Sequence, residues 1–369
     1  MVGAGQLARM TAQAAISLGV GFRVLADTAA DSAARVCADV QVGDYTALPD
    51  LLDFAKGCDV VTFDHEHVPG QHLAELERAV AVRPGPGALR YTQDKLAMRG
   101  RLTQLGVPCP RYQPVSDLAG VSAFAADAGW PVVLKAVSGG YDGRGVWMCE
   151  TPDEAAEVLA HGVAVFAEEH IDYDRELAVL AARSPHGQAA VYPVVQTVQR
   201  DGICHEVLAP APRLRARQAL QAQRLVLEIA AELEVTGLLA VELFETPRGL
   251  LLVNELAMRP HNSGHWTIEG ARTSQFEQHL RAVLDLPLGT PGAVAPQVVM
   301  ANVFGGSDPH VYERYLHVMA ADPGVKLHLY GKGVRPGRKI GHVTALGDDV
   351  DELRARAGRA ARYLATGED

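Results

Sequence analysis

Residues 132–145 read VVLKAVSGGYDGRG and join a short apolar run to a glycine-rich loop. The run 132–135 predicts a strand that ends on Lys135, and the eight residues from Ser138 to Gly145 contain four glycines. Glycine lets backbone N–H groups approach an anion closely, while a lysine at the strand end supplies a positive charge. The stretch therefore predicts a loop that covers phosphate groups, with an unliganded hairpin tip as the alternative. Because no G-K-[ST] follows, it differs from the phosphate loop of an ordinary P-loop fold.

A second element follows about a hundred residues later, where two apolar stretches predict a β-hairpin. Residues 235–244 and 250–257 read as strands, and the turn between them, 245–249, reads ETPRG, with Pro and Gly at positions typical of turns. The simplest register places the two residues that flank the turn, Glu245 and Leu250, opposite each other.

That register makes two acidic residues neighbours on one face of the hairpin. Glu242 is expected to face Val253, and Glu255 is then its diagonal neighbour, at about 7–8 Å between Cα atoms. Asn254 alternates to the opposite face, although at a strand end its side chain could still reach a metal or a phosphate. Two carboxylates on an apolar hairpin are costly to bury unless a cation lies between them. The pair predicts a magnesium site, with an outward-facing polar surface as the alternative.

Between the loop and the hairpin lies a short acidic segment. Residues 168–171 read EEHI and end a predicted strand, and Glu176 follows at the start of a stretch with strand character. Backbone groups of such a linker can pair with an adenine edge, and a carboxylate can accept hydrogen bonds from ribose hydroxyls. Taken alone, the segment is more readily interpreted as solvated acids.

The first 90 residues have the pattern of a doubly wound α/β unit. An apolar helix is expected over 7–18, and strands are expected over 22–26 and 60–63. A glycine turn at Gly3 and Gly5 normally follows a buried strand, but only two residues precede it, so the first strand is expected to be truncated.

The same turn admits two interpretations. Gly3, Gly5 and Ala8, with Asp27 about twenty residues on, match the dinucleotide fingerprint of an NAD-dependent oxidoreductase. The alternative is close packing of a helix on a strand, which uses glycine in the same way and binds no cofactor.

Composition and charge narrow the class of protein. The 369 residues favour two or three domains, and a net charge of −10 leaves no basic field to attract nucleic acid. The five cysteines are widely spaced with no C-x-x-C pair, which favours reduced thiols in a cytoplasmic protein over a zinc site or a disulfide framework. No apolar run is long enough for a membrane span.

The order of these motifs resembles the ATP-grasp superfamily. Within it, GAGQLARM at 3–10, YDGRG at 141–145, the run 254–266 and GRKIGH at 337–342 are similar to N5-carboxyaminoimidazole ribonucleotide synthetases, over nearly the whole chain. The resemblance implies an α/β and α+β multidomain fold. Its expected parts are a Rossmann-like pre-ATP-grasp domain at 1–91, an ATP-grasp domain at 92–293 with a mobile lid at about 108–170, and a small β-rich C-terminal domain at 294–369.

The resemblance also implies roles for individual residues. It assigns ATP binding to Lys95, Lys135, Gly140, Tyr141, Asp142, Gly143, Arg144, Gly145, Val146, Glu168, Glu169, His170, Ile171, Glu176, Asn254 and Glu255. It assigns one or two Mg²⁺ ions to Glu242 and Glu255. It assigns substrate binding to Tyr141, Asp142, Arg144, Asn262, Lys332, Arg338 and Glu66, and catalysis to Arg259, His261, Lys135, Tyr141 and Arg144.

Two further features bear on the substrate side. Lys332, Arg335, Arg338 and Lys339 place four cations within eight residues of an acidic chain, which favours a phosphate site over a solvated basic hairpin. His261 and His265, with Asn and Ser between them directly after the predicted metal-binding strand, favour a site, with polar packing as the alternative.

The reaction that the resemblance implies is a two-step ligation. ATP would phosphorylate bicarbonate to carboxyphosphate, and the amino group of aminoimidazole ribonucleotide would then take up the carboxyl group. The chain departs from the family at Gln196 and Gln199, where an acid and a histidine are common, so no nucleotide contact is assigned there. A homodimer is implied, and the alternatives are a formate-dependent glycinamide ribonucleotide transformylase and the NAD-dependent oxidoreductase.

Overall fold

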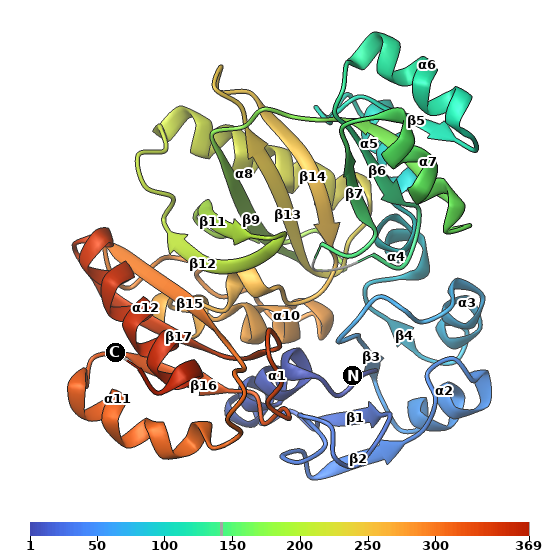
Figure 1. Cartoon of the computed structure of the whole chain (residues 1–369). Coiled ribbons are helices and arrows are strands. Elements are labelled where there is room, and N and C mark those ends of the chain that lie inside the picture. Colours follow the sequence, from blue (N-terminus) through green and yellow to red (C-terminus); the bar gives the residue numbers. More distant parts are fainter. Residues whose placement is uncertain (141–142, 369) are drawn as a thin grey trace.

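The computed structural model describes residues 1–140 and 143–368, and its N-terminal part is a parallel α/β unit (Figure 1). Two parallel pairs, β1 with β2 and β3 with β4, flank Val2, which forms parallel bridges to Leu25 and to Phe63. Residues 1–2 therefore fill the position of a central strand. The elements are α1 (Gln6–Leu18), β1 (Arg23–Ala26), β2 (Asp39–Val42), α2 (Leu48–Ala55), β3 (Val60–Val61), α3 (Gly70–Glu77), β4 (Ala81–Val82) and α4 (Pro86–Gln93).

A connecting helix and a small antiparallel sheet follow. Helix α5 (Lys95–Gln104) begins at Asp94, whose Oδ1 accepts a hydrogen bond of 2.8 Å from Ala97 N and so caps the helix. The sheet has the order β5-β8-β6-β7, with α6 and α7 packed beside it. Its elements are β5 (Tyr112–Val115), α6 (Leu118–Ala128), β6 (Val132–Ala136), β7 (Val146–Cys149), α7 (Pro152–Ala160) and β8 (Val165–Glu169). We call this unit, residues 112–169, the lid sheet.

The largest layer is an antiparallel sheet of nine strands that runs from the middle of the chain to its C-terminal part. Its order is β14-β13-β9-β11-β12-β15-β17-β16, and β10 pairs with β9. Helix α8 packs on β9 and β13, α10 packs on the same strands, and α12 covers β15 and β17 (Figure 1). The strands are β9 (Arg175–Arg183), β10 (Ala189–Val191), β11 (Val195–Arg200), β12 (Ile203–Ala209), β13 (Gly237–Glu245), β14 (Leu251–Ala257), β15 (Gln297–Phe304), β16 (Lys326–Leu329) and β17 (Lys339–Gly347).

Two long helices, α8 and α12, and several shorter ones accompany the nine-stranded sheet. The long helices α8 and α12 each bury one apolar face against the sheet, as an amphipathic period of 3.6 residues requires. The helical elements are α8 (Ala216–Glu232), η1 (Asn262–Gly264), α9 (Thr267–Gly270), α10 (Gln275–Val283), η2 (Val311–Arg314), α11 (Tyr315–Ala321) and α12 (Val350–Thr366). No helix of the described chain combines the length and the apolar character that a membrane span needs.

The expected α/β and α+β architecture is confirmed, and the C-terminal strands extend the large sheet. Strand β12 pairs with β15, so the residues after 293 continue the same layer.

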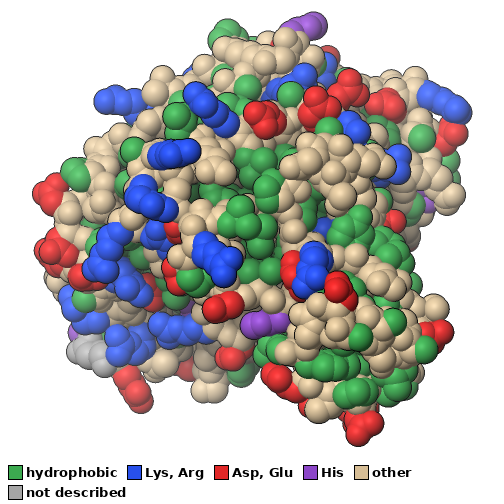
Figure 2. All heavy atoms as spheres, turned by 90° about the horizontal axis from the view of Figure 1, so that it is seen from above, with side chains coloured by type: hydrophobic (Ala, Val, Ile, Leu, Met, Phe, Trp, Pro, Cys, Tyr) green, Lys and Arg blue, Asp and Glu red, His purple; other side chains and the backbone are tan. Residues whose placement is uncertain are grey.

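Figure 2 shows apolar side chains in the middle of the face seen from above, with acidic and basic side chains around them.

Three histidines are fully buried, and the Nδ1 atom of each lies within hydrogen-bond distance of a polar group. His279 Nδ1 accepts from Leu238 N at 3.1 Å, His342 Nδ1 lies 2.7 Å from the Tyr330 hydroxyl, and His265 Nδ1 lies 3.0 Å from the Gln275 amide nitrogen. Burial lowers the pKa of all three rings, that of His279 to about 3. We infer that the folded chain holds them neutral.

These histidines make the stability of the fold depend on pH. Below the ordinary pKa of 6.5 the unfolded chain binds protons that the folded chain does not, so the free energy of unfolding falls as the pH falls from 6.5 toward 3. Each histidine is expected to contribute a slope of about 1.4 kcal/mol per pH unit in this window. Urea unfolding at pH 7, 6 and 5 measures the slope, and His279→Gln should reduce it by one histidine's share; an unchanged slope would contradict the assignment.

Candidate active site

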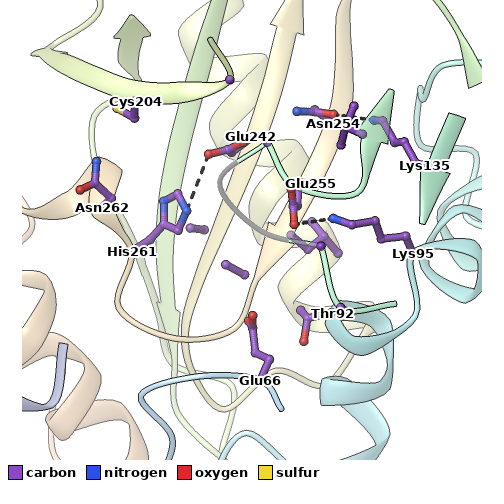
Figure 3. Close-up of a pocket in the computed structure, with 18 of the residues that line it drawn as sticks. Glu66, Thr92, Lys95, Lys135, Cys204, Glu242, Asn254, Glu255, His261 and Asn262 are labelled. Atoms are coloured by element: carbon purple, nitrogen blue, oxygen red, sulfur yellow. Dashed lines mark hydrogen bonds and ion pairs between the residues drawn. The ribbon is translucent and has the colours of Figure 1, made fainter. Parts of the chain in front are cut away.

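A large cavity of about 930 Å³ lies where the lid sheet, the large sheet and the N-terminal unit meet (Figure 3). It receives side chains from all three units, including most of the residues that the sequence predicted for a site. Those lining it are Glu66, Lys95, Lys135, Gly140, Gly143, Val146, Glu168, Glu169, His170, Ile171, Glu176, Glu242, Asn254, Glu255, Arg259, His261 and Asn262. Arg144, Gly145, Lys332 and Arg338 are described but do not line it, and Tyr141 and Asp142 lie outside the described residues.

A glycine of the glycine-rich loop and a glycine of the β11–β12 turn meet at the cavity. Gly143 in the loop after β6 lies against Gly202 in the β11–β12 turn, and a Cβ on Gly202 would lie 3.2 Å from the Cα of Gly143. Both residues have positive φ, +76° and +71°, so side chains at either position would be strained as well as crowded. Glycine at both positions is therefore what allows this close contact.

The acidic pair of the β13–β14 hairpin is closer than the sequence predicted. Glu245 pairs with Leu251 and not with Leu250, which displaces the register by one residue from the expected one. A second displacement lies between Glu242 and Leu243, so Glu242 lies directly opposite Glu255. The predicted diagonal arrangement is therefore wrong. A β-bulge adds one residue to β14, and the bulge brings both carboxylates to the same point of the sheet.

The extra residue of this bulge is Asn254. Leu243 pairs with Val253 and Glu242 with Glu255, which leaves Asn254 without a cross-strand partner. Strict alternation alone would turn its side chain to the opposite face, but its Oδ1 accepts a hydrogen bond of 3.1 Å from Lys135 Nζ in the cavity, so Asn254 reaches the site as was expected for this strand end (Figure 3). The bulge therefore brings the consecutive residues Asn254 and Glu255 to the same space as Glu242 of β13.

The charges around the hairpin shift the pKa values of the two carboxyl groups in opposite directions. Burial, together with Glu255 and Glu176, raises the pKa of Glu242 to about 8. Burial also opposes ionisation of Glu255, but Lys95 Nζ, 2.6 Å from its Oε1, keeps its pKa below the ordinary value. Glu255 is therefore ionised and Glu242 is largely protonated near neutral pH, and a cation bound between them would favour the ionised form of both.

Magnesium fits this donor set. Among the described residues no three His, Cys, Asp or Glu side chains gather as a complete metal cage. Mg²⁺ is commonly held by one or two carboxylates and completed by phosphate oxygens and water, which is what Glu242 and Glu255 beside Asn254 offer.

Lys135 belongs to a buried charge cluster at the back of the cavity. Its Nζ lies 2.5 Å from Glu168 Oε2, and Arg99 Nε lies 2.6 Å from the other oxygen of the same carboxylate. The side chains of Arg99 and Glu168 are 1% and 2% exposed. The carboxylate of Glu168 therefore binds both cations, and only the backbone of this residue remains for the adenine contact, which stays a prediction.

The remaining linker residues form one wall. Glu169 binds Arg111, with 2.7 Å from its Oε2 to Arg111 Nε, while His170 and Ile171 line the cavity. Tyr173 stacks on Phe244 with ring centroids 4.7 Å apart, and burial raises the pKa of Glu176. The wall combines apolar surface with backbone groups, which suits a planar base.

The opposite end of the cavity is built from the N-terminal unit and the turn after β14. Glu66 Oε1 accepts from Met258 N at 2.8 Å, and its Oε2 lies 3.4 Å from Arg259 Nε. His261 Nε2 lies 3.7 Å from Glu242 Oε1, so this end is continuous with the acidic pair (Figure 3).

His261 is held in place by a residue that sequence reasoning missed. The side chain of Gln275, fully buried, accepts from His261 N at 2.8 Å and donates to His261 O at 2.8 Å. Its amide nitrogen also lies 3.0 Å from His265 Nδ1. His265 is fully buried, which supports its interpretation as polar packing.

The glycine turn carries no dinucleotide site. The carboxylate of Asp64 accepts hydrogen bonds from Gly5 N and from Ala8 N, at the N-terminus of α1. These are the N–H groups that would hold a pyrophosphate in the NAD-dependent alternative. Lys332 Nζ donates to the side chain of Gln6 in the same turn, and both Gln6 and Lys339, the last residue of the basic segment, line the cavity.

Three family models match consecutive parts of the chain. The ribonucleotide synthetase preATP-grasp domain matches residues 1–93, the ATP-grasp domain matches 100–276, and the phosphoribosylaminoimidazole carboxylase C-terminal domain matches 298–356. Fold and cavity thus define an ATP-grasp ligase. The predicted limits 1–91, 92–293 and 294–369 remain predictions.

Curated relatives narrow the class further. The N5-carboxyaminoimidazole ribonucleotide synthase of Mycobacterium tuberculosis is 58% identical over 100% of this chain and 87% of its own length. That of Corynebacterium ammoniagenes is 48% identical, over 99% of this chain and 91% of its own. The chain belongs to the N5-carboxyaminoimidazole ribonucleotide synthase family.

Solved structures agree over the whole chain. N5-carboxyaminoimidazole ribonucleotide synthetase from Thermus thermophilus superimposes with a TM-score of 0.89 at 38% identity, covering 99% of both chains. The N5-carboxyaminoimidazole synthase of Aspergillus clavatus in complex with ADP and 5-aminoimidazole ribonucleotide has a TM-score of 0.90 at 30% identity, covering 98% of both chains.

Proposed function

We propose that the chain uses ATP and bicarbonate to carboxylate the 5-amino group of aminoimidazole ribonucleotide, a step of purine biosynthesis. One observation carries the proposal: the same cavity brings Lys95, Lys135 and the Glu242–Glu255 pair together with the turn 259–262. The first group suits nucleotide phosphates, and the second suits an anionic substrate. Membership of the family and the relative solved with ADP and the imidazole nucleotide support it.

The first step is phosphoryl transfer from ATP to bicarbonate, which turns a poor electrophile into carboxyphosphate. Lys95 and Lys135 would hold the phosphates and neutralise charge on the transferring group. Magnesium, held by Glu242 and Glu255, would supply further neutralisation when bound. The ion pair between Lys95 and Glu255 would loosen as phosphate and metal share these two side chains.

In the second step the amino group of the imidazole attacks the carbonyl carbon of carboxyphosphate, so that the C–O bond to phosphate breaks and phosphate and a proton leave, or it attacks the CO₂ formed once phosphate has left and then loses the proton. Arg259 and His261, both in the cavity wall, would position the carboxylate, and Asn262 and Glu66 would bind the nucleotide. The loop from Gly140 to Val146, with Tyr141, Asp142 and Arg144, would close over the site and exclude water from a short-lived intermediate. No covalent protein nucleophile is needed.

The setting of the enzyme is part of the proposal. Five free cysteines suit a cytoplasmic protein. A homodimer is supported by large exposed apolar side chains, Tyr312 at 78% and Leu316 at 80%, along η2 and α11. Size-exclusion chromatography with light scattering tests the oligomer, and a monomer would contradict it.

The function is tested by measuring ADP release with Mg·ATP. Turnover that requires both bicarbonate and aminoimidazole ribonucleotide is expected. Activity with glycinamide ribonucleotide and formate instead would preserve the ATP-grasp assignment and overturn the substrate.

A substitution at Glu66 separates the two ends of the cavity. Glu66→Gln removes the charge beside Arg259 without changing shape, so the KM for aminoimidazole ribonucleotide should rise about tenfold or more, while the KM for ATP changes little. Steady-state kinetics with each substrate varied in turn measures both. An effect on ATP alone would contradict the placement of the imidazole nucleotide.

A further inference from the structure

Arg99 is a buried cation that lies outside the cavity wall and joins two parts of it. It is 1% exposed, and its guanidinium donates to three acceptors on two different sheets. Nε donates to Glu168 Oε1 of the lid sheet at 2.6 Å, Nη1 donates to Val253 O at 3.0 Å, and Nη2 donates to Asn254 O at 2.8 Å. The last two acceptors belong to β14 of the large sheet.

The three acceptors of Arg99 belong to the residues that position the predicted phosphate-binding lysine and the predicted metal-binding carboxylate. The far oxygen of Glu168 holds Lys135, and the Asn254 side chain holds the same lysine from the other side. Val253 and Asn254 are the residues at the bulge of β14, whose carbonyl groups precede Glu255. The guanidinium of Arg99 therefore holds the Glu168 carboxylate, which binds Lys135. It also holds the backbone of β14 that orients the side chains of Asn254 and Glu255.

The helix that carries Arg99 reinforces this arrangement. Lys95 and Arg99 are one turn apart on α5, so they share a face of the helix. Lys95 reaches the Glu255 side chain at 2.6 Å, while Arg99 reaches the main chain just before it. Helix α5 thus contacts the bulge through two side chains that are one helical turn apart. In addition, Val253 N donates a hydrogen bond of 2.8 Å to Pro108 O.

We propose that Arg99 is a positioning residue for Mg·ATP: it locks the lid sheet to the β14 bulge behind the nucleotide and so sets the spacing between Lys135 and the Glu242–Glu255 pair. The inference rests on the proposed function, because that function supplies the nucleotide. Three directional hydrogen bonds on a planar fork distinguish this role from simple charge neutralisation, which a lysine could fill.

Two variants at position 99 test the role. Arg99→Met leaves Glu168 with Lys135 alone and frees both carbonyl groups, so the dissociation constant of Mg·ATP should rise about tenfold or more. The KM values for bicarbonate and aminoimidazole ribonucleotide should change less than about twofold. Arg99→Lys keeps the charge but cannot reach all three acceptors, so we expect a smaller loss, about threefold or more, in the same dissociation constant.

A neighbouring arginine supplies the matched control. Arg101 lies on the same helix, and its side chain is 31% exposed and pairs with Glu232 at 3.4 Å. Arg101→Met should leave the affinity for Mg·ATP unchanged. Thermal unfolding of all variants shows which of them are folded, and if Arg99→Met does not fold, Arg99→Lys decides the question.

Direct binding of Mg·ATP without the imidazole substrate keeps two failures apart. Folded Arg99 variants that bind Mg·ATP as the unsubstituted protein does, or whose KM values rise equally for all three substrates, would overturn the inference alone. An unsubstituted protein that binds Mg·ATP but does not turn over aminoimidazole ribonucleotide would overturn the proposed function and leave the Arg99 comparison valid.

Discussion

Glu255→Gln is expected to lower turnover by about 10³-fold or more, because the amide cannot supply the charge that a hard cation requires. The same change leaves Lys95, whose Nζ lies 2.6 Å from Glu255 Oε1, without its ionic partner. Both effects act on the phosphate end of the cavity, so the loss should appear in kcat as well as in the Mg²⁺ concentration needed for half-maximal rate. Initial rates over a Mg²⁺ titration measure it.

The control for this variant lies on the same hairpin. Glu245 is buried, but it pairs with Arg175 at 2.5 Å and does not line the cavity. Glu245→Gln should lower the unfolding temperature while keeping kcat and the Mg²⁺ dependence. Equal losses from the two substitutions would mean that the hairpin acts only through stability and would contradict a metal site at Glu255.

Lys135→Met should lower kcat/KM for ATP by about 10²-fold or more. The substitution removes a charge from the phosphate end and also leaves the carboxylate of Glu168 to Arg99 alone within the buried cluster. Burial lowers the pKa of Lys135 against the effect of Glu168, so the ammonium depends on that carboxylate. Steady-state kinetics at saturating bicarbonate measures the loss.

The result for Lys135 has its own control. Lys56 is an exposed lysine that pairs with Asp53 on the surface, 2.8 Å away, and Lys56→Met should leave all constants unchanged. A Lys135→Met enzyme with normal kcat/KM for ATP but a raised KM for aminoimidazole ribonucleotide would move this lysine to the other end of the cavity.

The first helix and the hairpin 235–257 could be predicted from sequence because their signals are local. Both follow from spacing within a few residues, and the structure places them at Gln6–Leu18, Gly237–Glu245 and Leu251–Ala257, close to their expected bounds. The co-location of Lys135, Glu242 and Glu255 required the resemblance as well, since nothing local joins segments a hundred residues apart.

The bulge of β14 could not be predicted in this way. An ideal hairpin register follows from the turn, but the extra residue at Asn254 is stabilised by Arg99 and Lys135, which lie 155 and 119 residues away in the chain. The use of the Glu168 carboxylate by Arg99 could not be predicted for the same reason. The signal that was present is the spacing of Arg99 from Lys95, four residues along one helix, which places both cations on one face.

In the proposed reaction ATP activates bicarbonate for transfer to the imidazole amine, and oxygen labelling follows this step. Turnover with ¹⁸O-bicarbonate, Mg·ATP and aminoimidazole ribonucleotide should place one labelled oxygen in the released phosphate and labelled carboxylate in the product, because phosphorylation forms a bond from a bicarbonate oxygen to phosphorus. Mass spectrometry of both products reads the transfer. Unlabelled phosphate accompanied by carboxylated product would contradict activation of bicarbonate by ATP.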